Sequence, residues 1–316
     1  MKNPMLSIVI PAFNEEENVC NTACVVQGIM EQAQIPYELI FVSDGSKDAT
    51  FGKVLEMAQA DSRIRGIEFS RNFGKESAIF AGLHAVKGGC AVVMDCDLQH
   101  PPQTIVEMYR LWEQGYDIVE GIKNSRGDES KLHKFFAKSF YKVISALTGF
   151  DMENTSDFKL LSRNVVDVLK EIPERKTFFR AMSFWVGFKT CQVHYDVAER
   201  AFGTSKWSFF GLVRYAVSNL VAFSTKPLSV VNYIGAASLL AGVILGIQTI
   251  VRWASGKALE GFTTVILLLL FLGGGILLGI GLIGNYVAAI YEEVKQRPRY
   301  LVRLDTEALL KQDSEE

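Results

Sequence analysis

Two long stretches without a charged residue limit how this chain can fold. The first runs from Pro227 to Val251 and the second from Gly261 to Tyr291. A helix needs about 20 consecutive apolar residues to cross a bilayer, and each stretch is longer than that. Buried core helices are the alternative, but these stretches are uncharged on every helical face. The sequence therefore predicts a hairpin of two transmembrane helices, at about residues 228–251 and 262–290, within a membrane segment 227–291.

Charges beside the two stretches predict the orientation of the hairpin. The connector at 252–260 holds two basic residues, whereas Lys226, Lys295 and Arg297 are among the basic residues on the other side. Because basic residues favour the cytosolic side, we expect a protein of the inner (plasma) membrane whose residues 1–226, tail at 292–316 and two termini all lie in the cytosol. Five cysteines without paired spacing agree with a reducing compartment. The polar tail is expected to be loose after Asp305.

The first 226 residues alternate between strand-like and helix-like segments. This alternation predicts an α/β fold, a Rossmann-like and mostly parallel sheet with helices on both faces. Ligands of such sheets bind outside the carboxyl ends of the strands. The expected strands are Leu6–Ile10, Tyr37–Val42, Ile64–Phe69, Cys90–Met94 and residues 117–120. Residues 71–76 are expected to lead into a helix through His84, and a further helix is expected near 102–114.

Polar side chains follow several of these strands and should converge on one crevice. They are Asn14, Glu15, Asp44, Asp95, Asp97 and Gln99. We also expect Asn14 and Ser46 to cap the helices that follow them. The chain has neither a G-x-G-x-x-G after its first strand nor a P-loop motif, which argues against a dinucleotide oxidoreductase and a P-loop NTPase. A net charge of −2 leaves no footprint for nucleic acid.

The fourth strand runs into Asp95 and Asp97, with Gln99 close behind. Alternating side chains would place both carboxylates on one side of an extended chain, and the two prolines at 101–102 must end the strand. A corner of carboxylate and amide oxygens suits Mg²⁺ or Mn²⁺ held against a diphosphate. The alternative is a strand-end turn whose aspartates are merely solvated.

Two further segments have the character of interfacial helices. Residues 131–148 carry lysines on one stripe, including Lys131 and Lys134, and apolar residues on the other side. Such a helix can lie in a membrane interface with its lysines on lipid phosphates. An ordinary helix packed on the sheet is the alternative. Residues 207–226 are rich in aromatic side chains, which are common beside a membrane span.

Several motifs together resemble a known family. Residues 7–15 (SIVIPAFNE), 43–46 (SDGS) and 95–97 (DCD) resemble family-2 glycosyltransferases of the GT-A fold. Residues 71–76 (RNFGKE) and 97–102 (DLQHPP) are similar to polyprenyl-phosphate glycosyltransferases related to dolichol-phosphate mannose synthase. The two spans and the segment after them resemble the bactoprenol glucosyltransferase (GtrB-like) branch. One departure is Ser43, where the family often has Asp.

The resemblance implies roles for residues at the matching positions. It implies catalytic roles for Asp95, Asp97 and Asp157, with Asp157 placed over the sugar. The other implied groups are a nucleotide site (Pro11, Phe13, Glu15, Asp44 and Lys75), a metal and diphosphate site (Asp95, Asp97 and Gln99) and basic residues for the phosphates or the acceptor (Arg200, Lys206, Arg126, Lys131 and Lys134).

The implied activity is inverting transfer of a hexose from UDP-glucose to polyprenyl (undecaprenyl) phosphate at the cytosolic membrane face, for modification of a cell-envelope glycan. The enzyme would use Mg²⁺ or Mn²⁺ and act as a homotetramer. The same fold could instead use UDP-GlcNAc, UDP-galactose or GDP-mannose. A non-catalytic membrane component of a flippase complex is the alternative from another class.

Overall fold

The computed structural model describes residues 4–124, 155–175, 178–196, 226–255 and 262–313. These residues belong to two compact units. The first unit holds the described residues up to 196 together with 297–313, and the second holds the described residues of 226–296. Each unit is described separately below.

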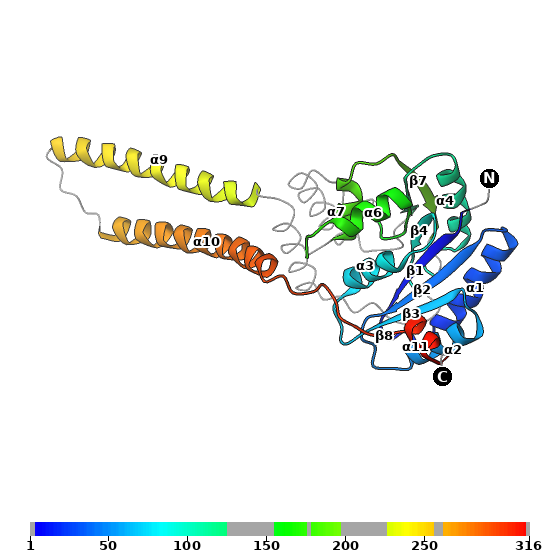
Figure 1. The fold of residues 1–316 in the computed structure, drawn as a ribbon. Coiled ribbons are helices and arrows are strands. Elements are labelled where there is room, and N and C mark those ends of the chain that lie inside the picture. Colours follow the sequence, from blue (N-terminus) through cyan, green and yellow to red (C-terminus); the bar gives the residue numbers. More distant parts are fainter. Residues whose placement is uncertain (1–3, 125–154, 176–177, 197–225, 256–261, 314–316) are drawn as a thin grey trace. The chain divides into compact units, whose positions relative to one another are not determined.

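The first unit is built on an eight-stranded sheet with the order β7-β5-β6-β4-β1-β2-β3-β8 (Figure 1). Neighbouring strands are parallel except where β6 and β8 pair antiparallel with their neighbours. The predicted, mostly parallel sheet is therefore confirmed, although β6, β7 and β8 were not foreseen. The strands are β1 (Leu6–Ala12), β2 (Tyr37–Ser43), β3 (Ile64–Phe69), β4 (Cys90–Val93), β5 (Ile118–Lys123), β6 (Lys159–Ser162), β7 (Thr190–Tyr195) and β8 (Val302–Asp305).

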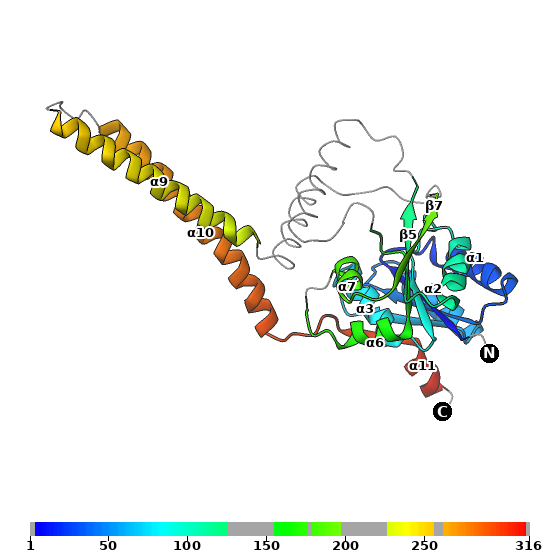
Figure 2. The ribbon, with the colours of Figure 1, turned by 90° about the horizontal axis from the view of Figure 1, so that it is seen from above.

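Helices cover both faces of this sheet, as the alternation of segments predicts (Figure 2). Strands β1 and β2 are buried along their whole length between the two helical layers. Continuous apolar runs such as Leu6–Ile10 are typical of parallel strands covered on both sides. One layer contains α1 (Val19–Gln32), α2 (Thr50–Ala60) and α4 (Gln103–Glu113), and the other contains α3 (Lys75–Ala85), α6 (Arg163–Glu171) and α7 (Phe179–Trp185).

Helix α3 lies unusually close to the centre of the sheet. A Cβ atom at Gly82 would overlap the side chain of Val9 on β1, so only glycine permits this approach. Residues Ala78–Leu83 of the helix are all buried. The close packing fixes the start of α3, where Lys75 lies, at the carboxyl end of β1.

The chain returns to the sheet at its carboxyl end. Strand β8 pairs antiparallel with β3, and α11 (Thr306–Asp313) follows directly. The Thr306 hydroxyl accepts the backbone N–H of Gly66 at 2.8 Å, and Thr306 is only 1% exposed. The expectation of a loose tail after Asp305 is therefore wrong for Thr306–Asp313, because these residues form a helix that is attached to the sheet at Thr306.

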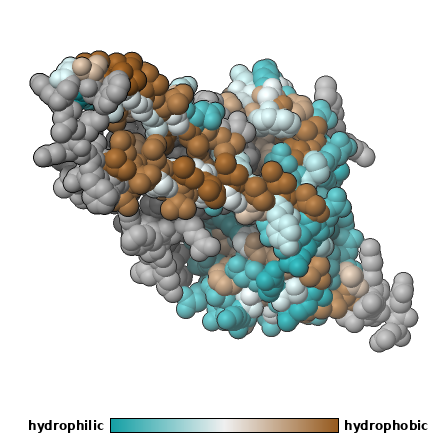
Figure 3. Space-filling view, turned by 90° about the vertical axis from the view of Figure 1, so that its left-hand side faces the viewer, coloured by the Kyte–Doolittle hydropathy of each residue, from teal (hydrophilic) through white to brown (hydrophobic). Residues whose placement is uncertain are grey.

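The second unit consists of two long helices, α9 (Lys226–Ala254) and α10 (Phe262–Val294). By length and composition, Val231–Arg252 and Leu268–Val294 within them could each cross a membrane. Large apolar side chains point outward along both helices, and Figure 3 shows the resulting apolar surface. The two predicted apolar helices are confirmed as helices. The predicted interfacial helix at 131–148, and 207–225 of the second one, lie outside the described residues.

Candidate active site

A cleft of about 320 Å³ opens at the carboxyl ends of β1, β2 and β4. This is the edge at which the strand order of an α/β sheet places its ligands. The structure brings together most of the residues that the sequence analysis assigned to a nucleotide and metal site. Those lining the cleft are Pro11, Phe13, Glu15, Asp44, Lys75, Asp95 and Asp97, whereas Asn14 and Gln99 do not line it.

Asn14 and Ser46 join the loops after β1 and β2. The Asn14 backbone N–H donates to the Ser46 hydroxyl at 3.1 Å, and the Lys47 N–H donates to Asn14 Oδ1 at 2.9 Å. Asn14 adopts a left-handed backbone with φ of 55°. The expected helix caps are therefore wrong: α1 begins at Val19 and α2 at Thr50, several residues later. Both side chains instead fix the shape of the cleft wall.

Asp44 lies beneath the loop that precedes α3. Its two carboxylate oxygens accept the backbone N–H groups of Phe73 and Gly74 at 2.6 and 2.9 Å. Burial raises the pKa of Asp44, and the two N–H donors oppose that shift. Gly45 next to it has a φ of +63°, and a Cβ atom there would overlap the backbone of Arg71. Asp44 and Gly45 thus hold residues 71–74 tightly against the end of β2.

The two aspartates of the fourth strand belong to a turn. β4 ends at Val93, so the alternation of side chains along a strand does not apply to Asp95 and Asp97. Leu98 has a φ of 57°, and Asp97 Oδ1 accepts the Gln99 N–H at 3.1 Å. This turn, rather than an extended strand, directs both carboxylates into the same cleft.

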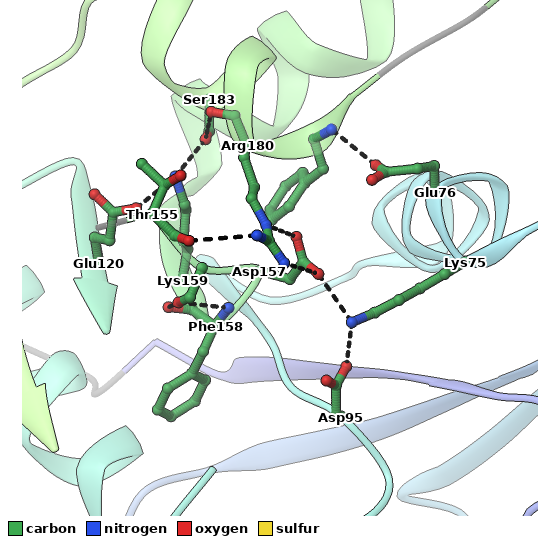
Figure 4. Close-up of polar contacts among 12 residues, drawn as sticks. Lys75, Glu76, Asp95, Glu120, Thr155, Asp157, Phe158, Lys159, Arg180 and Ser183 are labelled. Carbon is green, nitrogen blue, oxygen red and sulfur yellow. Dashed lines mark hydrogen bonds and ion pairs between the residues drawn. The ribbon is translucent and has the colours of Figure 1, made fainter. Parts of the chain in front are cut away.

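Lys75 connects Asp95 with Asp157 (Figure 4). Its ammonium nitrogen lies 2.6 Å from Asp95 Oδ1 and 2.8 Å from Asp157 Oδ2. Burial alone would lower the pKa of Lys75, but the two carboxylates outweigh it and raise the pKa. Burial likewise opposes ionisation of Asp95, and the charge of Lys75 reverses this and lowers the pKa of Asp95. The lysine therefore stays charged between two ionised carboxylates.

Arg180 on α7 holds the other side of Asp157. Its Nε and Nη2 atoms donate to the two carboxylate oxygens at 2.7 and 3.0 Å. Asp157 is only 5% exposed. Burial would raise its pKa, but Lys75 and Arg180 lower it far below its usual range. Asp157 is thus a fixed negative charge with little capacity to accept a proton near neutral pH.

Glu76 adds a further carboxyl group behind this cluster. Its Oε2 accepts the backbone N–H of Phe179 at 2.8 Å, which ties α3 to the start of α7. Burial raises the pKa of Glu76 to about 7, and the neighbouring charge of Asp157 adds to the effect. The raised pKa distinguishes Glu76 from Asp95 and Asp157, whose pKa values are lowered.

The sequence analysis did not foresee Arg180, Glu76 or the part played by His100. The His100 ring stacks on Phe158 with centroids 4.7 Å apart, and its Nδ1 accepts the Asp95 N–H at 3.2 Å. Burial lowers the pKa of His100, which keeps it a neutral acceptor. Only Glu76 and His100 lay inside motifs that could have pointed to them, whereas the surroundings of Arg180 carry no such pattern.

The residues present fit a divalent cation that is shared with a substrate. Among the described residues, no three His, Cys, Asp or Glu side chains converge as a closed metal cage would need. The carboxylates of Asp95 and Asp97 line the cleft and are a partial set of hard oxygen donors, whereas Gln99, on the same turn, does not line it. Mg²⁺ and Mn²⁺ suit such a set, because Mg²⁺ usually keeps several waters and binds through one or two carboxylates plus substrate phosphates.

Arg126, Lys131, Lys134, Arg200 and Lys206, which were assigned to phosphates or the acceptor, lie outside the described residues.

Several known proteins are similar to this chain in sequence. The sequence pattern of glycosyl transferase family 2 matches residues 7–169. The uncharacterized glycosyltransferase sll0501 of Synechocystis is 39% identical over 299 residues, covering 94% of each chain. The bactoprenol glucosyl transferase of Shigella phage SfII is 38% identical over 303 residues, covering 94% of this chain and 97% of the phage protein.

Among solved structures, one similar fold is glucosyl-3-phosphoglycerate synthase from Mycobacterium tuberculosis, crystallised with Mn²⁺ and UDP-glucose. Its TM-score is 0.48 at 20% identity, covering 70% of this chain and 79% of that one.

Proposed function

This chain belongs to glycosyl transferase family 2, and on that premise we propose that it transfers glucose from UDP-glucose to the phosphate of a polyprenyl lipid. The donor cleft with Asp95 and Asp97 is the observation that carries the proposal. Support for the lipid acceptor comes from the similarity to bactoprenol glucosyl transferases and from the two helices long enough to cross a bilayer. In this proposal, residues 1–226 and the carboxyl tail lie in the cytosol.

In the proposed reaction, an oxygen of the lipid phosphate attacks the anomeric carbon of the sugar. The bond from that carbon to the UDP oxygen breaks as the new bond forms on the opposite face, so the configuration inverts. The attacking phosphate is already an anion, so the reaction needs no strong base. Asp157, ionised and held by Lys75 and Arg180, is suited to orienting a sugar hydroxyl or the acceptor rather than to removing a proton.

Different cleft residues would bind different parts of the nucleotide-sugar donor. Asp44 and the loop after β1, with Pro11, Phe13 and Glu15, would hold the nucleoside. Asp97 and Gln99, with Asp95 beside them, would hold Mg²⁺ or Mn²⁺. When bound, that ion supplies Lewis-acid stabilisation of the charge on the departing diphosphate. Lys75 would keep Asp95 and Asp157 at a fixed separation while the donor binds.

The proposal is tested by giving the purified protein a panel of nucleotide sugars with undecaprenyl phosphate and identifying the lipid product by mass spectrometry. A glucosyl-phosphate lipid made from UDP-glucose is the expected product. A product made only from another donor would correct the sugar, and the absence of any transfer would favour the non-catalytic alternative. The Asp97→Ala variant should lose transfer by about a hundredfold or more while still binding membranes. Wild-type activity in that variant would remove the proposed metal site.

We propose in addition that the protein acts as a homotetramer. Helix α10 contains glycines at 273–275, 279, 281 and 284, and small residues allow membrane helices to approach each other closely. Chemical crosslinking in native membranes, with mass analysis of the largest product, would determine the number of subunits.

A further inference from the structure

The residues that follow the second long helix contact the segment that forms one wall of the cleft. We call residues 299–306 the strap and residues 71–76, which lead into α3, the cleft loop. The strap contacts the residues on either side of that loop: the Ser70 N–H donates to the Leu301 carbonyl at 3.0 Å, and the Ser77 hydroxyl lies 3.5 Å from the Arg299 carbonyl. The strap therefore fixes Ser70 and Ser77, the two residues between which the cleft loop lies.

The strap also supports the middle of the cleft loop through stacked rings. Tyr300 stacks on Phe69 with centroids 4.9 Å apart and planes 13° from parallel. Phe69 meets Phe73 of the cleft loop edge to face at 5.8 Å, and Phe69 is only 1% exposed. Aromatic pairs of this geometry are directional contacts, so the position of Tyr300 determines where Phe73 can lie.

The cleft loop in turn forms part of the cleft wall. The Phe73 and Gly74 N–H groups bind the Asp44 carboxylate, while Gly74 and Lys75 line the cleft. The contact of Gly45 with the Arg71 backbone leaves the loop no room to shift toward β2. A small displacement of Phe73 would thus move Asp44 and Lys75 together.

We propose that the strap is a positioning element of the donor site and that Tyr300 is its principal positioning residue. This inference rests on the proposed function, because it takes the cleft to be the nucleotide-sugar site. Tyr300 does not line the cleft, so it acts through its ring contacts, which are with Phe69 and, at 6.4 Å, with His84 of α3. Its loss should weaken binding of the donor and leave binding of the lipid acceptor unchanged.

The alternative is that the strap only seals the edge of the sheet. In that case any change that loosens the strap would lower stability without a particular effect on the donor. Thr306 provides the matched control. It belongs to the strap, is buried and accepts the Gly66 N–H, but it is attached to β3 before the cleft loop begins.

The experiment compares Tyr300→Ala, Tyr300→Phe and Thr306→Val in the full-length protein. Calorimetry with UDP and Mn²⁺ gives the affinity of the cleft, and steady-state rates give the KM values for UDP-glucose and undecaprenyl phosphate. We expect Tyr300→Ala to raise the UDP Kd and the donor KM about tenfold, with the acceptor KM unchanged. Tyr300→Phe keeps the stacking ring and should match the wild type. Thr306→Val should lower Tm but keep the wild-type donor KM.

Two results would overturn the role of the strap. One is a normal UDP Kd and donor KM in Tyr300→Ala, and the other is an equal rise of donor KM in Thr306→Val. If Tyr300→Ala does not fold, Tyr300→Leu keeps an apolar contact with Phe69 without the flat ring, and the same expectation applies. Failure of the proposed function looks different, since the wild-type protein itself would then bind no UDP and transfer no glucose.

Discussion

Asp157 shows how one buried carboxylate can be kept charged by its neighbours. It accepts two bonds from Arg180 and one from Lys75, and those cations come from two different helices. A group with such a lowered pKa stabilises positive charge and orients hydroxyl groups, but it is a poor proton acceptor. The geometry of the cluster therefore agrees with an anionic nucleophile that needs alignment more than deprotonation.

The two hydrogen bonds that Arg180 donates to Asp157 should matter more for the rate of sugar transfer than its charge does. Lysine at this position keeps the charge but cannot make two parallel bonds to Asp157. We expect Arg180→Lys to lower the rate of sugar transfer by about tenfold to a hundredfold, since the carboxylate would lose its fixed orientation. Arg110→Lys is the matched control, because Arg110 lies on α4 and forms an exposed pair with Glu113 rather than with a residue of the cluster. Equal rates in wild type and Arg180→Lys would contradict the orienting role.

Glu76 should make stability depend on pH near neutrality. Its folded pKa of about 7 exceeds the unfolded value of 4.5, so the folded protein binds more protons between these two values. That contribution to stability is present at low pH and is lost as the pH rises through 7. Gln at position 76 cannot ionise but can still accept the Phe179 N–H. Wild type should therefore lose stability between pH 5 and pH 8 relative to Glu76→Gln. The Tm difference (Glu76→Gln minus wild type) should rise by several degrees over this range.

The comparison with Glu76→Gln isolates the contribution of one carboxyl group to the pH dependence of Tm. His100, whose pKa burial lowers, contributes with the opposite sign in the same range of pH, but it is present in both proteins. A difference in Tm that stays constant with pH would mean that Glu76 does not titrate there.

Single residues of the site could be predicted where they directly follow a strand. Asp44, Asp95 and Asp97 follow expected strands, and parallel strands bring their carboxyl ends to one edge. Arg180 could not be found in this way, because its partnership with Asp157 depends on how α7 packs beside α3. No local pattern encodes a contact of that kind.

At the scale of elements, the edge of the sheet was the least predictable part. β8 is a strand of four residues that follows a long apolar helix, and its sequence, VRLD, alternates apolar and charged side chains over a stretch too short to stand out from a polar tail. It is defined by its partner β3, whose buried Glu68 meets Arg303. β6 is equally short and lies antiparallel between β4 and β5, an arrangement that strand–helix alternation does not suggest.

The pair between Arg303 and Glu68 should stabilise this edge. Glu68 is 4% exposed, and removing its partner leaves a carboxylate with little water around it. We expect Arg303→Ala to lower the free energy of unfolding by about 1 to 2 kcal/mol, because the buried carboxylate loses its partner. The loss stays this small because Arg303 itself is largely exposed to solvent. Arg110→Ala breaks an exposed pair and should cost about 0.5 kcal/mol or less. Chemical denaturation in detergent measures both, and equal values would show that Glu68 does not need the arginine.

At the scale of the whole molecule, the apolar stretches predicted the two long helices because their length and composition leave few other folds. The orientation of these helices is a proposal that the distribution of charge supports. It places the connector between α9 and α10 outside the cytosol and the cysteines of the first unit inside.

Cysteine labelling tests this orientation directly. Cys20 and Cys24 are exposed on the first unit, so a membrane-impermeant maleimide should reach them only after the cells are made permeable. The variant Ser255→Cys adds a thiol in the connector, directly after α9, and should be labelled in intact cells. The wild-type protein is the control. Labelling of Cys20 and Cys24 in intact cells would reverse the proposed topology.

The position of β8 has a consequence for biosynthesis. A ribosome makes β3 early and β8 last, after both long helices have been translated. Until β8 emerges, the β3 edge lacks its neighbour, and Glu68 lacks Arg303. The sheet can therefore be finished only by a chain whose apolar helices already exist, and a prematurely terminated chain leaves an open edge that invites aggregation.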